Sequence, residues 1–257
     1  MDLGIAGRTA LVCASTSGLG LATASALAHD GATVVVSGRS DERVRDAAAG
    51  LPGAVGIAVD LVGEGGAERL YAATVEQVGE PDILVLNGPG PAPGSARDVG
   101  PDGIRTAIAT LVAPHQVLLE RALPGMIDRG WGRVLSISSS GVQAPIPGLA
   151  LSNLGRAALA GYLKTLATEV AASGVTVNSL LPGRIATARA EQVDTAAAER
   201  TGRSREEVEA EVRGTIPVGR YGDPAEFGAA AAFLCSAPAG YITGTVLRCD
   251  GGMLATP

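Results

Sequence analysis

The residues between positions 13 and 20 have the types and spacing that could bind a phosphate group. They read Cys13-Ala14-Ser15-Thr16-Ser17-Gly18-Leu19-Gly20 and join an apolar run to a helix-forming stretch. Glycines in such a turn let the backbone approach a pyrophosphate, and the helix N-terminus supplies free N–H groups. Two glycines can also serve packing alone, but their place after the first predicted strand favours dinucleotide binding. We expect cofactor contacts from Ser15, Ser17, Gly18, Leu19 and Gly20.

The end of the second predicted strand distinguishes between two forms of dinucleotide. It reads Ser37-Gly38-Arg39-Ser40, without the Asp or Glu that binds the ribose of NAD. Gly38 leaves room for a 2′-phosphate, and Arg39 can bind that phosphate through two hydrogen bonds. The sequence therefore favours NADP as the cofactor, with NAD as the second choice. The alternative is that Arg39 is a solvated residue in a turn.

These residues need a scaffold that brings strand ends together, and the rest of the sequence predicts one. Apolar runs rich in β-branched residues alternate with helical stretches, which is typical of a doubly wound parallel sheet with helices on both faces. The predicted strands are Thr9–Ala14, Thr33–Ser37, Ala54–Val59, Ile83–Asn87, Gly132–Ser138, Val175–Leu180 and Thr245–Arg248. The predicted helices are Gly18–His29, Asp41–Ala49, Gly65–Val78, Asp102–Asp128, Ser152–Ala172 and Pro224–Ser236. We expect one α/β domain of the Rossmann type over residues 1–257.

One segment, Ala188–Gly222, interrupts this alternation and is more highly charged than the rest of the chain. Ser204 and Glu207 have the spacing of a capping box, which predicts a helix beginning near Ser204. The segment follows the sixth strand, and ligands of doubly wound sheets bind at the carboxyl ends of strands. We interpret it as a lid over a substrate, with a surface excursion without function as the alternative.

The composition excludes several classes of function. The net charge is −6, which argues against a basic surface for nucleic acid. No stretch reaches the roughly 18 apolar residues that cross a membrane, and we expect a cytoplasmic protein. Cys13, Cys235 and Cys249 are widely spaced in apolar runs, which favours buried thiols over disulfides or a metal site.

Further motifs give the sequence a resemblance to a known family. They are Asp60-Leu61, Asn87-Gly88-Pro89-Gly90, Gly132-Arg133-Val134, Val175-Thr176-Val177-Asn178, Pro182-Gly183-Arg184-Ile185-Ala186-Thr187, Gly240-Tyr241-Ile242-Thr243-Gly244 and Asp250-Gly251-Gly252. With the glycine turn, they make the chain resemble the short-chain dehydrogenase/reductase family, and within it the branch similar to β-ketoacyl-ACP reductase. The resemblance covers nearly the whole sequence.

The resemblance implies roles for several of these residues. Asp60 and Leu61 should flank the adenine, Asn87 and Gly88 the adenosine ribose, and Pro182, Gly183, Ile185 and Thr187 the nicotinamide carboxamide. The first glycine of the family's turn is Ala14 here, and its methyl group is expected to weaken binding. Two long predicted helices, Asp102–Asp128 and Ser152–Ala172, correspond to the family's dimer interface, so the resemblance implies a homo-dimer or homo-tetramer.

The family's catalytic residues are largely replaced in this sequence. Members use a Tyr as proton donor, a Lys four residues later, a Ser and an Asn, and these positions hold Ser152, Arg156, Ser139 and Leu111. A serine hydroxyl is much less acidic than a phenol, and arginine stays protonated and cannot relay a proton. The usual mechanism is therefore not available. Ser139, Ser152 and Arg156 remain as donors that could bind a carbonyl oxygen or an oxyanion.

Two further residues are candidates for the substrate pocket. His115 lies one turn after Leu111 on the same face of a predicted helix, and histidine titrates near neutral pH. A lone histidine on an apolar helix is more often a packed structural residue. Gln143 follows Ser139 by four residues, where family members line the substrate pocket.

The residues are compatible with three functions. The first is an NADP-dependent oxidoreductase acting on a small carbonyl or alcohol, with the proton supplied through Ser152, a substrate group or ordered water. The second is a non-redox enzyme such as a cyclase, isomerase or dehydratase, which the loss of the proton donor favours. The third is a catalytically silent nucleotide-binding protein. The fold alone does not choose among them.

Overall fold

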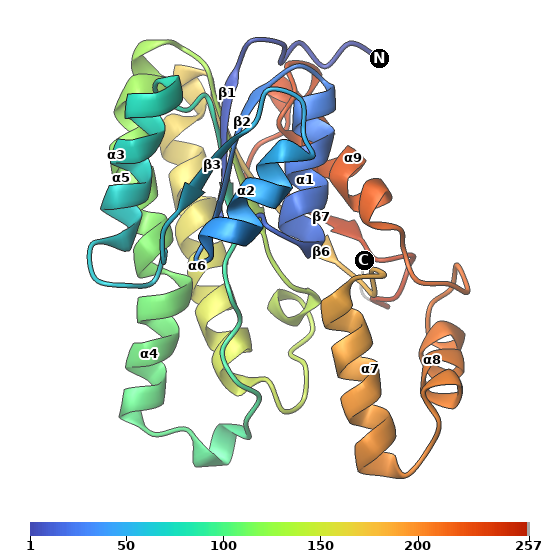
Figure 1. The fold of residues 1–257 in the computed structure, drawn as a ribbon. Coiled ribbons are helices and arrows are strands. Elements are labelled where there is room, and N and C mark those ends of the chain that lie inside the picture. Colours follow the sequence, from blue (N-terminus) through green and yellow to red (C-terminus); the bar gives the residue numbers. More distant parts are fainter. Residues whose placement is uncertain (256–257) are drawn as a thin grey trace.

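The computed structural model describes residues 1–255 and contains a seven-stranded parallel sheet with the order β3-β2-β1-β4-β5-β6-β7 (Figure 1). Each strand lies within two residues of its predicted bounds. The strands are β1 Thr9–Val12, β2 Thr33–Gly38, β3 Val55–Ala58, β4 Ile83–Leu86, β5 Gly132–Ile137, β6 Val175–Pro182 and β7 Val246–Cys249. The central strands are apolar along their whole length because helices cover both faces of the sheet.

The helices form two layers, one on each face of the sheet. They are α1 Gly18–His29, α2 Asp41–Ala49, α3 Gly66–Val78, α4 Pro101–Leu111, α5 Ala113–Asp128, α6 Ala150–Val170, α7 Ala188–Thr201, α8 Arg205–Gly214 and α9 Pro224–Leu234. Helices α1, α2 and α9 pack against one face, and α3, α5 and α6 pack against the other. Alternate residues of β1 serve the two cores, with Val12 in the first and Leu11 in the second.

The predicted helix Asp102–Asp128 is wrong, because the chain forms two helices that break at Val112. Pro114 explains the break. Proline has no N–H to bond the carbonyl one turn earlier, and its ring disfavours a helical conformation in the preceding residues. The break makes Leu111 the last residue of α4, whereas His115 lies in the first turn of α5.

The excursion between β6 and α9 contains two helices, α7 and α8, which project away from the sheet (Figure 1). The predicted start of α8 is confirmed. The Ser204 hydroxyl accepts a hydrogen bond from the Glu207 N–H, and the Glu207 carboxylate accepts one from the Ser204 N–H. Helix α7 was not predicted, although Thr187 caps its first turn by accepting a hydrogen bond from Ala190 N. Within residues 1–255, no helix is long and apolar enough to cross a membrane.

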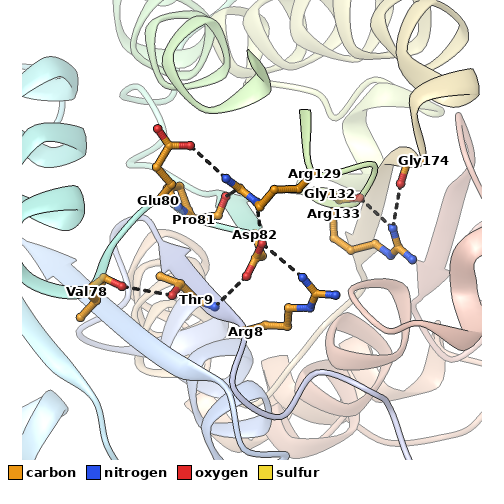
Figure 2. A network of polar contacts seen from close by, with 10 residues as sticks. All are labelled: Arg8, Thr9, Val78, Glu80, Pro81, Asp82, Arg129, Gly132, Arg133 and Gly174. Carbon is orange, nitrogen blue, oxygen red and sulfur yellow. Dashed lines mark hydrogen bonds and ion pairs between the residues drawn. The ribbon is translucent and has the colours of Figure 1, made fainter. Parts of the chain in front are cut away.

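A polar network joins the amino-terminal ends of β1, β4 and β5, at the opposite edge from the strand ends that carry the glycine turn (Figure 2). Asp82 accepts hydrogen bonds from Arg8 (3.5 Å), Thr9 N (3.3 Å) and Arg129 Nε (3.2 Å). Arg129 also forms an ion pair with Glu80 at 3.0 Å. The network therefore fixes the starts of neighbouring strands to one another.

The buried residue Arg133 extends this edge into the next strands. Its guanidinium donates to the carbonyl oxygens of Gly132 and Gly174, and to that of Ser236. The ring of Trp131 lies between Arg8 and Arg133, with guanidinium carbons 4.0 and 4.4 Å from its centroid. Such contacts contribute about 0.5–1 kcal/mol each at exposed sites. This edge of the molecule serves stability.

Candidate functional site

The carboxyl ends of the strands gather the residues that the sequence singled out. The strand order reverses between β1 and β4, which lie side by side at the centre of the sheet. A doubly wound sheet opens a crevice at such a switch point, and ligands bind there. The glycine turn follows β1 and the Asn87 turn follows β4, so both turns border this crevice.

The glycine turn packs closely against itself and against the turn after β4. A Cβ atom at Gly20 would lie 2.6 Å from the Ala14 carbonyl oxygen and 2.8 Å from Asn87 Nδ2. Asn87 donates to that same carbonyl at 3.0 Å, so the turn after β4 holds the turn after β1 in place. Ala14 has a φ of +46°, in the left-handed region that favours glycine.

Two residues of the turn face the interior. Ser15 is fully buried, and its hydroxyl donates to Val12 O at 2.7 Å while accepting from Ser37 N at 3.0 Å. Its backbone N–H also donates to Ser37 O at 2.8 Å, so neither the hydroxyl nor the amide of Ser15 is left for a cofactor. Leu19 packs against the core beneath α1. Ser17 and Gly18 remain at the helix entrance, with their backbone amides free of a side-chain cap.

The end of β2 carries two arginines beside the glycine turn. Arg39 is exposed, and no residue in the described part of the chain bonds to its guanidinium. Arg43, one turn into α2, donates from Nη2 to Ser17 Oγ at 3.3 Å. A Cβ atom at Gly38 would lie 2.7 Å from Thr16 Cγ2, so the two segments are in close contact. Arg43 was not predicted from the sequence, although its spacing of four from Arg39 could have indicated it.

The turns after β3 and β4 hold the residues expected near the adenosine. Asp60 is exposed and its carboxylate accepts from Val62 N at 3.3 Å, whereas Leu61 is buried in the core. Gly88 lies in front of the His115 ring, which would be 3.7 Å from a Cβ atom at that position. Leu61 can therefore support the turn, and Asp60 and Gly88 line it.

The segment after β6 lies over the glycine turn. Gly183 is in close contact with β7, because a Cβ atom there would lie 2.5 Å from Asp250 Cα. Ile185 is buried and pairs with Gly222 in an isolated bridge. A Cβ atom at Gly18 would lie 3.9 Å from Thr187 Cγ2. Pro182–Thr187 thus closes one side of the crevice, with the turn after β1 opposite.

Ser139 lies just after β5, and Ser152 and Arg156 lie in the first two turns of α6, which packs on the residues after β5. Ser139 begins the short helix η2 (Ser140–Val142), where its hydroxyl accepts from Gly141 N at 3.1 Å. The first turn of α6 packs on η2, and Asn153 closes the connecting loop through two hydrogen bonds with Ile146. On α6, Arg156 donates from Nε to Ser152 Oγ at 3.4 Å and from Nη1 to Ile137 O at 3.2 Å.

The surroundings of Arg156 are apolar. Leu111 is 2% exposed and packs against Gly155, where a Cβ atom would lie 2.6 Å from Leu111 Cδ1. Burial lowers the pKa of the Arg156 guanidinium from its ordinary value. The arrangement therefore offers hydrogen-bond donors and a positive charge in a partly desolvated position. It offers no phenol.

His115 is buried at the helix break, and Gln143 lies against the end of β7. His115 is 3% exposed, with Nδ1 3.0 Å from Leu111 O and Nε2 3.4 Å from Asn87 O. Burial lowers the pKa of His115, and the charge of Arg156 acts in the same direction, while the two carbonyls oppose the shift. Its ring therefore joins the helix break to the Asn87 turn. Gln143 Oε1 accepts from Arg248 Nε at the end of β7.

A buried carboxylate ties the excursion to the rest of the crevice. Asp194 of α7 is 1% exposed and accepts from the Tyr221 hydroxyl at 2.8 Å, while its other oxygen lies 3.6 Å from Arg184 Nη1. Burial, with the Asp194 hydrogen bond and charge, raises the pKa of Tyr221 to about 12. The cluster of Arg184, Asp194 and Tyr221 was not predicted from the sequence, because its members lie in three segments that only the fold brings together.

Comparison with known proteins agrees with this architecture. A family model described as enoyl-(acyl carrier protein) reductase matches residues 13–254. Dehydrogenase/reductase SDR family member 4 of Homo sapiens is 36% identical over 253 residues, covering 96% of this chain and 88% of the relative. A 3-oxoacyl-[acyl-carrier-protein] reductase of Aquifex aeolicus is 31% identical over 98% of this chain and 100% of the relative.

The solved structures extend the likeness to three dimensions. L-Sorbose reductase from Gluconobacter frateurii, complexed with NADPH and L-sorbose, matches with a TM-score of 0.93 at 30% identity, over 100% of both chains. Its similarity spans the glycine turn, the strand order and the segment after β6. With relatives above 30% identity over nearly the whole chain, this protein belongs to the short-chain dehydrogenase/reductase family.

Proposed function

We propose that this protein is an NADP-dependent oxidoreductase that interconverts a small carbonyl compound and its alcohol through an active site without the family's Tyr and Lys. The observation that carries the proposal is the group of turns at the carboxyl ends of β1, β2 and β4. The glycine turn enters α1 without a side-chain cap, and two arginines, Arg39 and Arg43, lie beside it at the end of β2. The complex of L-sorbose reductase with NADPH, at a TM-score of 0.93, supports the same cofactor.

The residues present fit a nicotinamide dinucleotide with a 2′-phosphate. The close approach at Gly20 leaves backbone amides facing a pyrophosphate at the start of α1. Arg39 and Arg43 would hold the 2′-phosphate, because guanidinium groups bind phosphate through paired hydrogen bonds. The segment Pro182–Thr187 would hold the nicotinamide end. When bound, the reduced dinucleotide supplies a hydride to the carbonyl carbon.

The catalytic residues of this proposal are Ser139, Ser152 and Arg156. Hydride addition moves the carbonyl electron pair onto oxygen, where the developing charge is stabilised by the two hydroxyls and the guanidinium. The oxygen then takes a proton, through Ser152, a group of the substrate or an ordered water. Arg156 holds its own proton throughout. His115 positions the Asn87 turn, and Gln143 borders the pocket from η2.

The excursion formed by α7 and α8 acts in this proposal as a lid over the substrate. It leaves the sheet directly after the nicotinamide-binding segment, and Asp194 ties it to Arg184 of that segment. We also propose a homo-oligomer formed through the long helices. Ile104 and Ile108 of α4 are 42% and 37% exposed, and Leu154 of α6 is 36% exposed. Together they provide an apolar surface for a second copy.

Calorimetric titration of NADPH and NADH into the wild type and Arg39→Ala tests the cofactor. Loss of a charge-assisted phosphate contact costs about 1.5–3 kcal/mol, so NADPH should bind at least about tenfold more weakly and NADH should change little. Arg43→Ala should behave alike. Arg45→Ala is the matched control, because Arg45 is an exposed arginine of α2, the helix that also contains Arg43. Equal losses for NADPH and NADH would contradict the 2′-phosphate assignment.

Absorbance at the reduced-nicotinamide band, followed with a panel of ketones and quinones, tests for turnover. Turnover by the wild type that is lower in the variants Ser152→Ala and Arg156→Met supports the oxidoreductase proposal. Binding of NADPH without turnover would favour the non-redox enzyme, for which the absence of a phenol beside Ser139 is the supporting observation. It would also leave the silent nucleotide-binding protein as a candidate.

A further inference from the structure

The candidate active site contains hydrogen-bond donors whose hydrogens have no acceptor in the described chain. Ser139 Oγ accepts from Gly141 N and Ser152 Oγ accepts from Arg156 Nε, and no protein group within residues 1–255 accepts from either hydroxyl. Arg156 donates from Nε to Ser152 and from Nη1 to Ile137 O, which leaves Nη2 without an acceptor within residues 1–255. The three side chains are partly exposed, so a ligand can reach them.

The backbone carbonyl beside Arg156 is already used as an acceptor. Ile137 O accepts from Arg156 Nη1. Leu111 packs against Gly155, the residue before Arg156, and adds only apolar contact there. A site lined by donors is complementary to a group that only accepts hydrogen bonds. A neutral hydroxyl or amide group carries hydrogens of its own, and these would face donors and find no acceptor.

The charge of Arg156 has no counter-ion in the residues that the structure describes. No carboxylate lies within 4.0 Å of its guanidinium, whereas Arg8, Arg129, Arg205 and Arg220 each form an ion pair. A partly desolvated cation without a partner is unfavourable, and proteins normally pair such groups. Desolvation is the cause of the lowered pKa of Arg156. The position therefore favours an anionic ligand.

We propose that the substrate is an oxo acid, whose carboxylate binds to Arg156 while its reacting carbonyl faces the hydroxyls of Ser139 and Ser152. This inference rests on the proposed function, because it identifies the substrate class of the same site. The carboxylate supplies the counter-ion that the described residues do not give Arg156, and it accepts the hydrogen bond that Nη2 can still donate. Arginine pairs with carboxylate through two parallel N–H···O bonds, a geometry that lysine does not provide.

Binding to the holoenzyme separates the anion from its neutral isosteres. Wild type saturated with NADP⁺ is titrated by calorimetry with oxamate against oxamide, and with acetoacetate against acetoacetamide. Each pair differs in charge while its shape is nearly the same. We expect at least one carboxylate to bind about tenfold or more tightly than its amide, which corresponds to roughly 1.4 kcal/mol. The preference should weaken at high salt less than a surface contact would, because the site is partly buried.

Variants assign the preference to Arg156. Arg156→Met should abolish the difference between acid and amide, and Arg156→Lys should retain part of it. Arg121→Met is the matched control, because Arg121 is an exposed arginine of α5. Unfolding followed by circular dichroism shows whether each variant is folded, and Arg156→Lys carries the test if Arg156→Met is not.

The outcomes distinguish a failure of the oxo-acid proposal from a failure of the proposed NADP-dependent oxidoreductase function. NADPH binding with equal or absent binding of acid and amide overturns the oxo-acid substrate and leaves the oxidoreductase proposal intact. Loss of NADPH affinity in Arg156→Met with an unchanged acid preference also overturns it, because Arg156 would then serve the cofactor. Absence of NADPH binding to the wild type overturns both proposals.

Discussion

At the scale of single residues, Ala14 shows how one methyl group can oppose the geometry of a binding turn. It is the one non-glycine residue with positive φ in residues 1–255, at +46°. That conformation costs an L residue about 1–2 kcal/mol, while glycine would lose about 0.5–1 kcal/mol more chain entropy on folding. The turn accepts this strain because Asn87 holds the Ala14 carbonyl from the neighbouring strand.

We expect Ala14→Gly to leave the protein as stable or up to about 1 kcal/mol more stable, and to bind NADPH up to about fivefold more tightly. Removing the methyl relieves strain where the backbone amides must face the pyrophosphate. Thermal unfolding and calorimetric titration measure the two effects. Ala72→Gly is the control, because Ala72 is exposed in the interior of α3 and the change should cost about 1 kcal/mol there. A similar loss for Ala14→Gly would contradict the strain.

Ser139, Ser152 and Arg156 could be proposed from the sequence because the motifs Gly132-Arg133 and Pro147-Gly148 fix their positions. In the structure Arg156 bonds to Ser152 and to Ile137 O, two residues before Ser139. Their catalytic roles remain predictions. The interior hydroxyl of Ser15 could not be predicted, because its bonds to Val12 and Ser37 depend on how β1 and β2 pair.

At the scale of elements, the proposed lid, Ala188–Gly222, is held by a carboxylate that no local pattern reveals. Asp194 joins α7 to Tyr221, which lies 27 positions later in the chain. The capping box at Ser204 predicted α8, but no local pattern predicted the contact between Asp194 and Tyr221. The same limit applies to the break between α4 and α5, since the apolar pattern continues across it and only Pro114 indicates the interruption. Strand and helix bounds elsewhere followed from periodicity.

We expect Tyr221→Phe to loosen the lid. The change removes a donor from a buried carboxylate, whose hydrogen bonds are worth about 1.5–3 kcal/mol when charged. Limited proteolysis within Ala188–Gly222 should become faster, and KM for substrate should rise more than kcat falls. Tyr162→Phe, at a phenol 38% exposed on α6, is the control. Unchanged proteolysis would show that Asp194 is held by Arg184 alone.

The same hydrogen bond should make the stability of the proposed lid depend on pH in the alkaline range. The pKa of Tyr221 is raised from 10.0 to about 12, so the folded state favours the neutral phenol. The stabilisation is present in full below pH 10 and is lost as the pH rises toward about 12. Proteolysis of the lid should therefore accelerate over that range in the wild type. Tyr221→Phe should lack this acceleration.

At the scale of the whole molecule, stability and binding occupy opposite edges of one sheet. The Asp82 network joins the strand starts (Figure 2), whereas the glycine turn and the Asn87 turn follow the strand ends. We expect Asp82→Asn to destabilise the fold by about 2 kcal/mol, because it weakens two arginine contacts and one backbone bond. That corresponds to a fall in Tm of roughly 4–8 °C for a chain of this size. NADPH affinity should not change.

Urea unfolding and NADPH titration of Asp82→Asn check this separation. Asp128→Asn is the matched control, because Asp128 is an exposed acid at the end of α5. Stability should respond only to the first substitution. A parallel loss of NADPH affinity would mean that the two edges are coupled through the sheet.

The placement of Trp131 gives this protein its own optical reporter. It is the single tryptophan of the chain, and its indole is clamped between the guanidinium groups of Arg8 and Arg133. The indole can lose both cations only when the edge formed by the first strand and β5 comes apart. Its fluorescence emission should therefore follow global unfolding in a single step. Each variant described above can be ranked by that one signal without a label.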